Sequence, residues 1–356
     1  MFVFRVPAPD RVPLFRSIAP YGEYDPRPTK EPAMESTPRL RFTPTRCLAL
    51  LVLCALVLCP YARGLAGERL KFVFISPCRD EAFFGPVKKG MADAARLMDV
   101  ECEFVGTEDV DLKAQAEMVH KAVADGYDGI ALNIIDPVAF DEVVRQAIDK
   151  GVPVVAFNVD DHATPNARLS AVCQDLYQAG VTLGKRAGES IPPGSKVLAT
   201  LHSEGISALD DRLRGAQDAL KEKNLSWRVV VSGNEPEKAL EVIAKELAAD
   251  PEIRAVLCTG LTDTEAAGLA ASRRFPDRSL VVAGFDLSAD ILRLVKTGTI
   301  RFTIDQQPYV QGFYPVVHLA QYCRYGIKPA NVDAGATIIT AKDVDRVIEL
   351  SRKGYR

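Results

Sequence analysis

Short apolar runs alternate with amphipathic segments along most of this chain, and this alternation limits its fold more than any other feature. Segments of about 10–15 residues with helical spacing separate runs that are rich in Val, Ile and Phe. This pattern predicts βαβ units and a parallel sheet with helices on both faces. The predicted strands are 71–76, 101–106, 129–133, 152–158, 196–202, 228–232, 255–259, 280–285 and 301–306.

The alternation restarts near Asp175, which divides the chain into two halves of similar size without a Pro-, Gly- or Ser-rich linker. We therefore expect an α/β fold with two doubly wound, Rossmann-like parallel-sheet domains facing a ligand cleft. The predicted helices are 85–98, 111–125, 137–150, 175–189, 206–223, 235–249, 263–274, 289–295 and 311–325.

The first 66 residues differ from the rest, because they hold ten of the 23 prolines. Three arginines precede Cys47–Cys59, an uncharged apolar run of 13 residues, and the small residues Gly64 and Ala66 follow it. A membrane-spanning helix needs about 20 apolar residues, so this pattern favours a secretory signal peptide cleaved near Ala66. A membrane anchor, a buried helix and a lipoprotein signal are the alternatives. We also expect translation to begin at Met34, so that residues 1–33 are not made.

Cysteine and histidine spacing supports neither a metal site nor a redox pair. Cleavage would leave five widely spaced cysteines, namely Cys78, Cys102, Cys173, Cys258 and Cys323, and an exported protein could pair two of them. The four histidines are scattered. We expect no cofactor, since the chain lacks the Gly-rich phosphate and dinucleotide motifs and the common hydrolase motifs.

The charge balance argues against nucleic acid as a partner. The formal net charge is −3, and the first 66 residues hold nine basic but only five acidic side chains. The remainder is therefore more acidic than the whole chain, which disfavours binding to phosphates.

Polar side chains follow the predicted strands in both halves, where ligands of open parallel sheets bind. Carboxylates and amides at these positions suit the hydroxyls of a neutral polyol, although each residue could instead cap a helix. An aromatic pair, Phe83 and Phe84, could lie against a sugar ring, and Arg212 offers a fixed fork of donors. The polar residues are Ser76, Asp80, Asn133, Asn158, Asp160, Asp161, Asp286 and Gln306.

Across about residues 70–345 the chain resembles the ribose-binding type of periplasmic sugar-binding protein from ABC transporters (the type I periplasmic binding fold). The order and spacing of several segments carry the resemblance: Phe83–Phe84 with 87–91, then 126–133, 151–158, Arg212–Gly215, 281–288 and 304–309. The resemblance implies a monomeric, periplasmic receptor without enzymatic activity that delivers a small sugar or polyol to a membrane permease. It also implies that Phe83 and Phe84 stack on the sugar, while Ser76 and Asp80 lie on the first loop and Asn133, Asn158, Arg212, Asp286 and Gln306 hydrogen-bond its hydroxyls.

The resemblance further implies three crossings between the domains, near 174–175, 306–307 and 333–337, that act as hinges for closure around the ligand. The expected division is an extension and signal peptide over 1–66, an N-terminal domain of 67–174 plus 307–335, and a C-terminal domain of 175–306 plus 336–356.

One departure from the family leaves the ligand open. Ribose binders carry Asp-Arg where this chain has Asn158-Val159, so another pentose, a hexose, an inositol or an amino-polyol fits as well. Asp80, Glu81, Asp160 and Asp161 could favour a cationic ligand or simply be solvated. Three other functions share the pattern: the sugar-sensing subunit of a signalling receptor, an exported carbohydrate enzyme, and the effector half of a repressor. The last would need an N-terminal helix-turn-helix.

Overall fold

The computed structural model describes residues 69–356 except 81, 137, 161–165 and 205. These residues belong to one compact unit, Glu68–Arg356. The predicted signal peptide, its cleavage near Ala66, the start at Met34, Glu81 and Asp161 lie outside the described residues. Within the described part, no helix has both the length and the apolar character that crossing a membrane requires.

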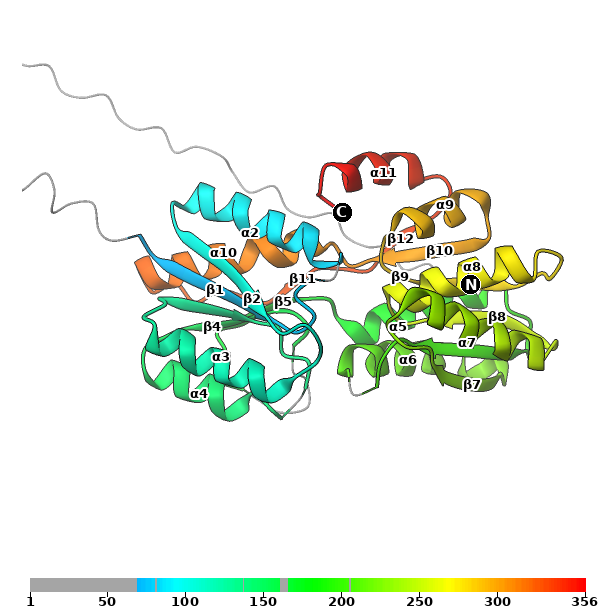
Figure 1. Cartoon of the computed structure of the whole chain (residues 1–356), viewed down its shortest axis with the longest axis horizontal. Helices are drawn as coiled ribbons and strands as arrows, with labels where there is room; N and C mark the ends of the chain where they lie inside the picture. Colours follow the sequence, from blue (N-terminus) through cyan, green and yellow to red (C-terminus); the bar gives the residue numbers. More distant parts are fainter. Residues whose placement is uncertain (1–68, 81, 137, 161–165, 205) are drawn as a thin grey trace, which may run out of the picture. The chain divides into compact units, whose positions relative to one another are not determined.

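Two six-stranded sheets form the unit (Figure 1). The first sheet has the order β11-β5-β4-β3-β1-β2, and all its paired strands are parallel. Its strands are β1 (Lys71–Ser76), β2 (Glu101–Gly106), β3 (Gly129–Leu132), β4 (Val154–Asn158), β5 (Ser170–Cys173) and β11 (Val332–Asp333).

The second sheet repeats this plan in the order β12-β10-β9-β8-β6-β7, and only β12 runs antiparallel to its neighbour. Its strands are β6 (Lys196–Leu201), β7 (Ser226–Val231), β8 (Ile253–Cys258), β9 (Val281–Phe285), β10 (Ile300–Asp305) and β12 (Thr337–Ile339). The predicted fold class, two doubly wound parallel-sheet units, is confirmed.

Side-chain alternation along the strands covers both faces of each sheet. In β1, Phe72 and Phe74 pack with α2 (Phe84–Met98) and α10 (Pro308–Tyr325), whereas Val73 and Ile75 pack with α3 (Leu112–Ala124) and α4 (Asp141–Asp149). Figure 1 shows these helix pairs on opposite sides of the sheet. Successive side chains of a strand point to opposite faces of the sheet, so a continuously apolar strand is buried on both faces.

The second sheet is covered in the same way. One face packs against α5 (Leu176–Gly188) and α6 (Ser207–Ala219), which a short 3-10 turn, η1 (Lys221–Lys223), follows. The other face packs against α7 (Pro236–Ala249), α8 (Leu261–Arg274), α9 (Ala289–Thr297) and α11 (Val344–Arg352).

Close helix contacts fix the position of α6. A Cβ atom on Gly180 of α5 would overlap the carbonyl oxygen of Arg212, and one on Gly215 of α6 would overlap that of Tyr177. Only glycine allows the two backbones to approach this closely. The helix that carries Arg212 is therefore held directly against α5.

Among the helix starts, the sequence prediction differs most from the structure at residue 137, and the prediction is incomplete near the chain end. The helix predicted from residue 137 begins at Asp141, because the Asp136 carboxylate accepts the amides of Val138 and Ala139 (2.9 and 2.8 Å) and holds a turn before it. Sequence analysis missed β5, β11, β12 and α11. The first three are only four, two and three residues long, too short for a clear periodicity.

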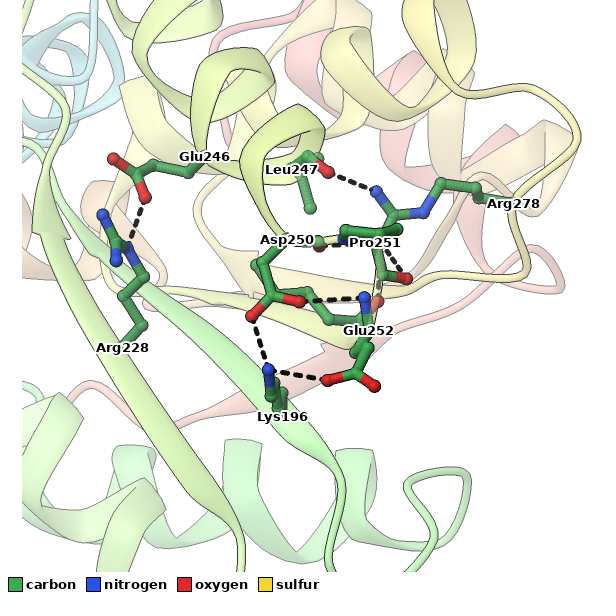
Figure 2. A network of polar contacts seen from close by, with 9 residues as sticks. Lys196, Arg228, Glu246, Leu247, Asp250, Pro251, Glu252 and Arg278 are labelled. Atoms are coloured by element: carbon green, nitrogen blue, oxygen red, sulfur yellow. Dashed lines mark hydrogen bonds and ion pairs between the residues drawn. The ribbon is translucent and has the colours of Figure 1, made fainter.

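A polar network closes the end of the second sheet where its strands begin (Figure 2). The Arg278 guanidinium donates to the carbonyl oxygens of Leu247 (2.6 Å), Pro251 (3.1 Å) and Ile253 (2.8 Å). Lys196 contacts the carboxylates of Asp250 (2.9 Å) and Glu252 (2.7 Å). Arg278 thus ties the end of α7 and the start of β8 to the loop before β9, and Lys196 ties the loop between α7 and β8 to the start of β6.

Replacing Arg278 should destabilise the fold, since the three carbonyls lose a charged donor. For Arg278→Ala we expect the free energy of unfolding, measured by urea denaturation, to fall by about 1–3 kcal/mol. Arg273→Ala is the matched control, because Arg273 is exposed on α8 and its substitution should change stability by less than about 0.5 kcal/mol. Equal stabilities of the two variants would contradict this assignment.

Candidate functional site

A cavity lies where strands of both sheets end. Its empty space measures about 760 Å³ when the open solvent at its mouth is included. Residues after β1, β3 and β4 of the first sheet line it together with residues after β6, β7, β8, β9 and β10 of the second. The carboxyl ends of parallel strands thus converge on one space.

Seven of the nine predicted site residues line this cavity: Phe83, Phe84, Asn133, Asn158, Arg212, Asp286 and Gln306. The other two do not. Ser76 is fully buried behind the wall, where its hydroxyl accepts a hydrogen bond from Asn133 Nδ2 (3.1 Å). Asp80 is exposed and pairs with Arg79 instead.

A chain of buried side-chain hydrogen bonds forms the polar wall. Asn133 Nδ2 donates to Asn158 Oδ1 (3.1 Å), and Asn158 Nδ2 donates to Gln306 Oε1 (3.4 Å). Gln306 Nε2 then donates to Asp286 Oδ1 (2.6 Å). Asn158 Nδ2 also reaches Gln311 Oε1 (3.0 Å) on α10. Four strand ends from two sheets are therefore joined through neutral amides and one carboxylate.

The backbone at this wall is strained. Asn158 (φ 64°) and Asp286 (φ 69°) adopt the left-handed conformation, as does Gln307 (φ 53°) in the second crossing. Residues other than glycine rarely adopt this backbone conformation, and those that do are found most often at ligand-binding and active sites. Here the backbone turns at Asn158 and Asp286, at the ends of β4 and β9, and both side chains line the cavity.

Arg212 is held rigidly although it is buried. Its Nε and Nη2 both donate to Gln174 Oε1 (3.1 and 2.8 Å), its Nη1 donates to the Thr259 carbonyl (2.8 Å), and its guanidinium lies 4.1 Å from the centre of the Phe285 ring. Burial lowers the pKa of Arg212, whereas the charges of Asp286 and Asp263 raise it. An arginine side chain stays protonated in proteins, so it presents a fixed cation.

The two aromatic residues differ in exposure. Phe84 is buried in the core, and the Phe83 ring meets it edge to face with centroids 5.2 Å apart. Phe83 is only partly buried and also lines the cavity. Phe83 therefore has the freer surface of the two for a ligand, with Phe84 supporting it.

Sequence reasoning missed several polar residues of the cavity and its support. His202, Ser203, Asn234 and Thr262 also line it, at the ends of β6, β7 and β8. Their position after strands was a usable signal, the same one that identified Asn133. Gln311 and Gln174, which hold Asn158 and Arg212, lie on α10 and in the first crossing, where sequence alone shows no partner.

The described acidic residues that could have favoured a cationic ligand lie outside the cavity lining. Asp160 is buried in an ion pair with Arg168, and neither Asp160 nor Asp80 is part of the cavity lining. The five described cysteines are free thiols. In the described part of the chain no cluster of three His, Cys, Asp or Glu side chains could hold a metal ion.

His202 is neutral at physiological pH. Burial, with a smaller effect from the Arg212 charge, lowers its pKa to about 4, whereas an unfolded chain has a histidine pKa of about 6.5. As the pH falls from about 6.5 to 4, the unfolded chain binds a proton that the folded protein does not. The folded state therefore loses stability in this window.

A His202→Gln variant tests this linkage. Relative to the variant, the wild-type protein should lose up to about 3 kcal/mol of unfolding free energy between pH 6.5 and 4. Burial raises the pKa of Asp263 to about 7, so Asp263 also makes the unfolding free energy depend on pH and stabilises the fold less as the pH rises. This contribution to the unfolding free energy is present in both proteins and cancels in their difference. Urea denaturation across this range measures the difference; parallel pH profiles would contradict the buried neutral imidazole.

The family model described as periplasmic binding protein domain matches residues 72–327. The xylose/arabinose-binding protein XylF of Sulfolobus acidocaldarius is 28% identical over 299 residues, which cover 79% of this chain and 74% of that protein. The ribose import binding protein RbsB of Bacillus subtilis is 26% identical over 65% of this chain and 74% of its own length.

Solved structures agree with these relatives. A carbohydrate transporter protein from Acidothermus cellulolyticus, in complex with myo-inositol, superimposes with a TM-score of 0.72 at 28% identity, over 81% of this chain and 100% of the other. GanP, a glucose-galactose binding protein from Geobacillus stearothermophilus, gives a TM-score of 0.70 at 25% identity, over 78% and 99%. These relatives are binding proteins rather than enzymes, and the chain belongs to the periplasmic binding protein family.

Proposed function

We propose that this protein is the solute-binding component of an ABC importer and that it binds an uncharged simple sugar or polyol in the cavity between the two sheets. The observation that carries the proposal is the composition of the cavity wall. Among its described lining residues only Arg212 and Asp286 are charged, and the others carry neutral amides, hydroxyls, a thiol, an imidazole, the rings of Phe83 and Phe84, or aliphatic groups. The names of the relatives, which refer to xylose, arabinose and ribose, support it.

The wall suits hydroxyl groups better than charged ones. A sugar hydroxyl both donates and accepts, so it can pair with an amide, a carboxylate or a guanidinium. Asn133 Oδ1 is buried and accepts no hydrogen bond in the described structure, which leaves it available to a ligand hydroxyl. Among the described residues of the cavity lining, Asp286 alone could balance the cation of an amino sugar, and a phosphorylated sugar would add an anion that faces Asp286.

Binding would close the two halves around the ligand by a hinge motion. The chain passes from the first sheet to the second between β5 and α5, returns between β10 and α10, and passes again between β11 and β12. The crossings contact one another, since Gln174 Nε2 donates to the Gly335 carbonyl and Gln307 Nε2 to that of Ala334 (2.7 Å each). These bonds support a hinge at 174–175, 306–307 and 333–337.

The domain division that follows is 67–174 with 307–335, and 175–306 with 336–356. In this proposal the protein is exported, loses its signal peptide near Ala66 and acts as a monomer in the periplasm. A membrane permease would recognise the closed form. No covalent chemistry is needed, because uptake requires only binding, closure and release.

A thermal-shift and calorimetric panel tests the binding proposal. The probes are D-xylose, L-arabinose, D-ribose, D-glucose, D-galactose, myo-inositol and D-glucosamine. At one hundred times its dissociation constant, a ligand stabilises the folded state by about 2.7 kcal/mol, so a neutral sugar should raise the melting temperature clearly. D-glucosamine should bind more weakly than D-glucose.

Two arginines of α6 provide the matched control. Arg212→Ala should weaken binding of the neutral sugar by about 1–3 kcal/mol, because buried ligand hydroxyls lose their partner. Arg214→Ala should leave affinity unchanged, since Arg214 is exposed and pairs with Asp211. No binding of any neutral sugar to protein freed of copurified ligand by unfolding and refolding, or equal losses in the two variants, would reject the proposal.

Hinge closure predicts a more compact protein in the presence of ligand. Small-angle X-ray scattering at saturating sugar should show a smaller radius of gyration than scattering without sugar. Arg212→Ala at the same sugar concentration should show a smaller change, in proportion to its lower occupancy. An unchanged radius at calorimetrically verified saturation would show that binding occurs without closure.

A further inference from the structure

The His202 ring occupies space that a side chain at position 260 would otherwise fill. Gly260 lies two residues after the end of β8, at the N-cap of α8, and His202 directly follows the neighbouring strand β6. A Cβ atom on Gly260 would lie 2.5 Å from Cδ2 and 2.9 Å from Nε2 of His202. Real Cβ contacts are not this short, so the imidazole can hold its position only because residue 260 has no side chain. The backbone of Gly260 is extended (φ −148°), which any residue could adopt.

The hydrogen bonds of the imidazole leave one nitrogen free for a ligand. Nδ1 shares a hydrogen bond with Ser203 Oγ (3.1 Å), whereas Nε2 bonds to none of the residues that the structure describes. His202 and Gly260 both line the cavity, and Cδ2 and Nε2 are the ring atoms nearest to Gly260. Beside it, Thr262 Oγ1 donates to Asn234 Oδ1 (2.9 Å), and both residues line the same wall.

We propose, on the basis of the proposed function, that His202 is a specificity-determining residue whose Nε2 hydrogen-bonds one particular hydroxyl of the bound sugar, in a position opened by Gly260. The wall formed by His202, Asn234 and Thr262 then recognises the part of the sugar that faces the ends of β6, β7 and β8. A site built to hydrogen-bond a hydroxyl strongly rejects the analogue that lacks it, because its buried polar group is left unpaired.

Four variants and one control separate this role from a structural one. The variants are His202→Ala, His202→Gln, Gly260→Ala and the double variant His202→Ala/Gly260→Ala. Gly85→Ala is the matched control, because an added Cβ there meets no atom within 4 Å and Gly85 is outside this cavity. Calorimetry uses the neutral sugar of the panel above that binds the wild-type protein most tightly.

We expect His202→Ala to weaken binding about ten- to hundredfold, as loss of a buried hydrogen-bond partner predicts. His202→Gln should recover part of this loss, because its amide can still reach a hydroxyl. Gly260→Ala should weaken binding by displacing the ring, yet it should cost little more once the ring is absent. The double variant should therefore bind about as well as His202→Ala, and Gly85→Ala should bind like the wild-type protein.

The monodeoxy analogues of the same sugar give a readout that a merely structural role would not change. For one ring position, removal of the hydroxyl should weaken binding to the wild-type protein about tenfold or more but hardly change binding to His202→Ala. The other deoxy analogues should lose the same factor in both proteins. Thermal unfolding without sugar verifies that each variant is folded before its affinity is compared.

Three results would overturn the inference. The first is wild-type affinity in a folded His202→Ala variant. The second is a set of deoxy analogues that all lose the same factor in both proteins, and the third is a loss from Gly260→Ala that is equally large with and without the His202 ring. If the wild-type protein binds no neutral sugar, the proposed function fails as well, and this outcome differs from sugar binding that is insensitive to residue 202.

Discussion

The hydrogen-bonded chain of Asn133, Asn158, Gln306 and Asp286 is the interaction on which the cavity depends. These side chains are buried at the ends of β3, β4, β10 and β9, where a polar group without a partner costs about 1–3 kcal/mol. Each link satisfies one such group and fixes the next. This series of hydrogen bonds starts in one sheet and ends in the other. The same bonds that pair the buried polar groups of the wall therefore also connect the parts of the wall that the two sheets contribute.

The bond to Gln311 explains why an amide rather than a carboxylate suits position 158. Asn158 donates through Nδ2 to Gln306 and Gln311 while it accepts through Oδ1 from Asn133. An ionised carboxylate cannot donate a hydrogen bond. An aspartate at position 158 would therefore place a carboxylate oxygen against the acceptor oxygens of Gln306 and Gln311. The neighbouring Val159, where ribose binders carry arginine, is likewise buried without charge. The departure from the ribose-binding pattern thus replaces two charged side chains by two neutral ones, an amide at position 158 and an apolar side chain at position 159.

The sequence was sufficient for the two sheets and for most residues of the cavity wall, because both follow local rules. Apolar runs identify buried strands, and a polar residue directly after a strand, such as Asn133 or Asp286, lies at the ligand edge of a parallel sheet. Ser76 obeys the same rule yet lies behind the wall, and Asp80 lies outside it, since loop geometry decides where such residues point. The pairing of His202 with Gly260 joins positions that lie beyond the ends of two separate strands, β6 and β8. No local sequence pattern shows that the missing side chain at one position makes room for the other.

The charges near the cavity show how a buried arginine can serve an uncharged ligand. Arg212 is 3% exposed, so an isolated guanidinium there would be costly. Its donors to Gln174 and Thr259 and the nearby Asp286 and Asp263 charges compensate before any ligand arrives. The Arg212 charge also disfavours protonation of His202, which keeps that imidazole able to donate and accept. A ligand that enters this cavity therefore exchanges its hydrogen bonds with water for hydrogen bonds with fixed groups that are either neutral or already paired. Ligand hydroxyl groups can form such hydrogen bonds, whereas a net charge on the ligand would lose its hydration without gaining an unpaired opposite charge.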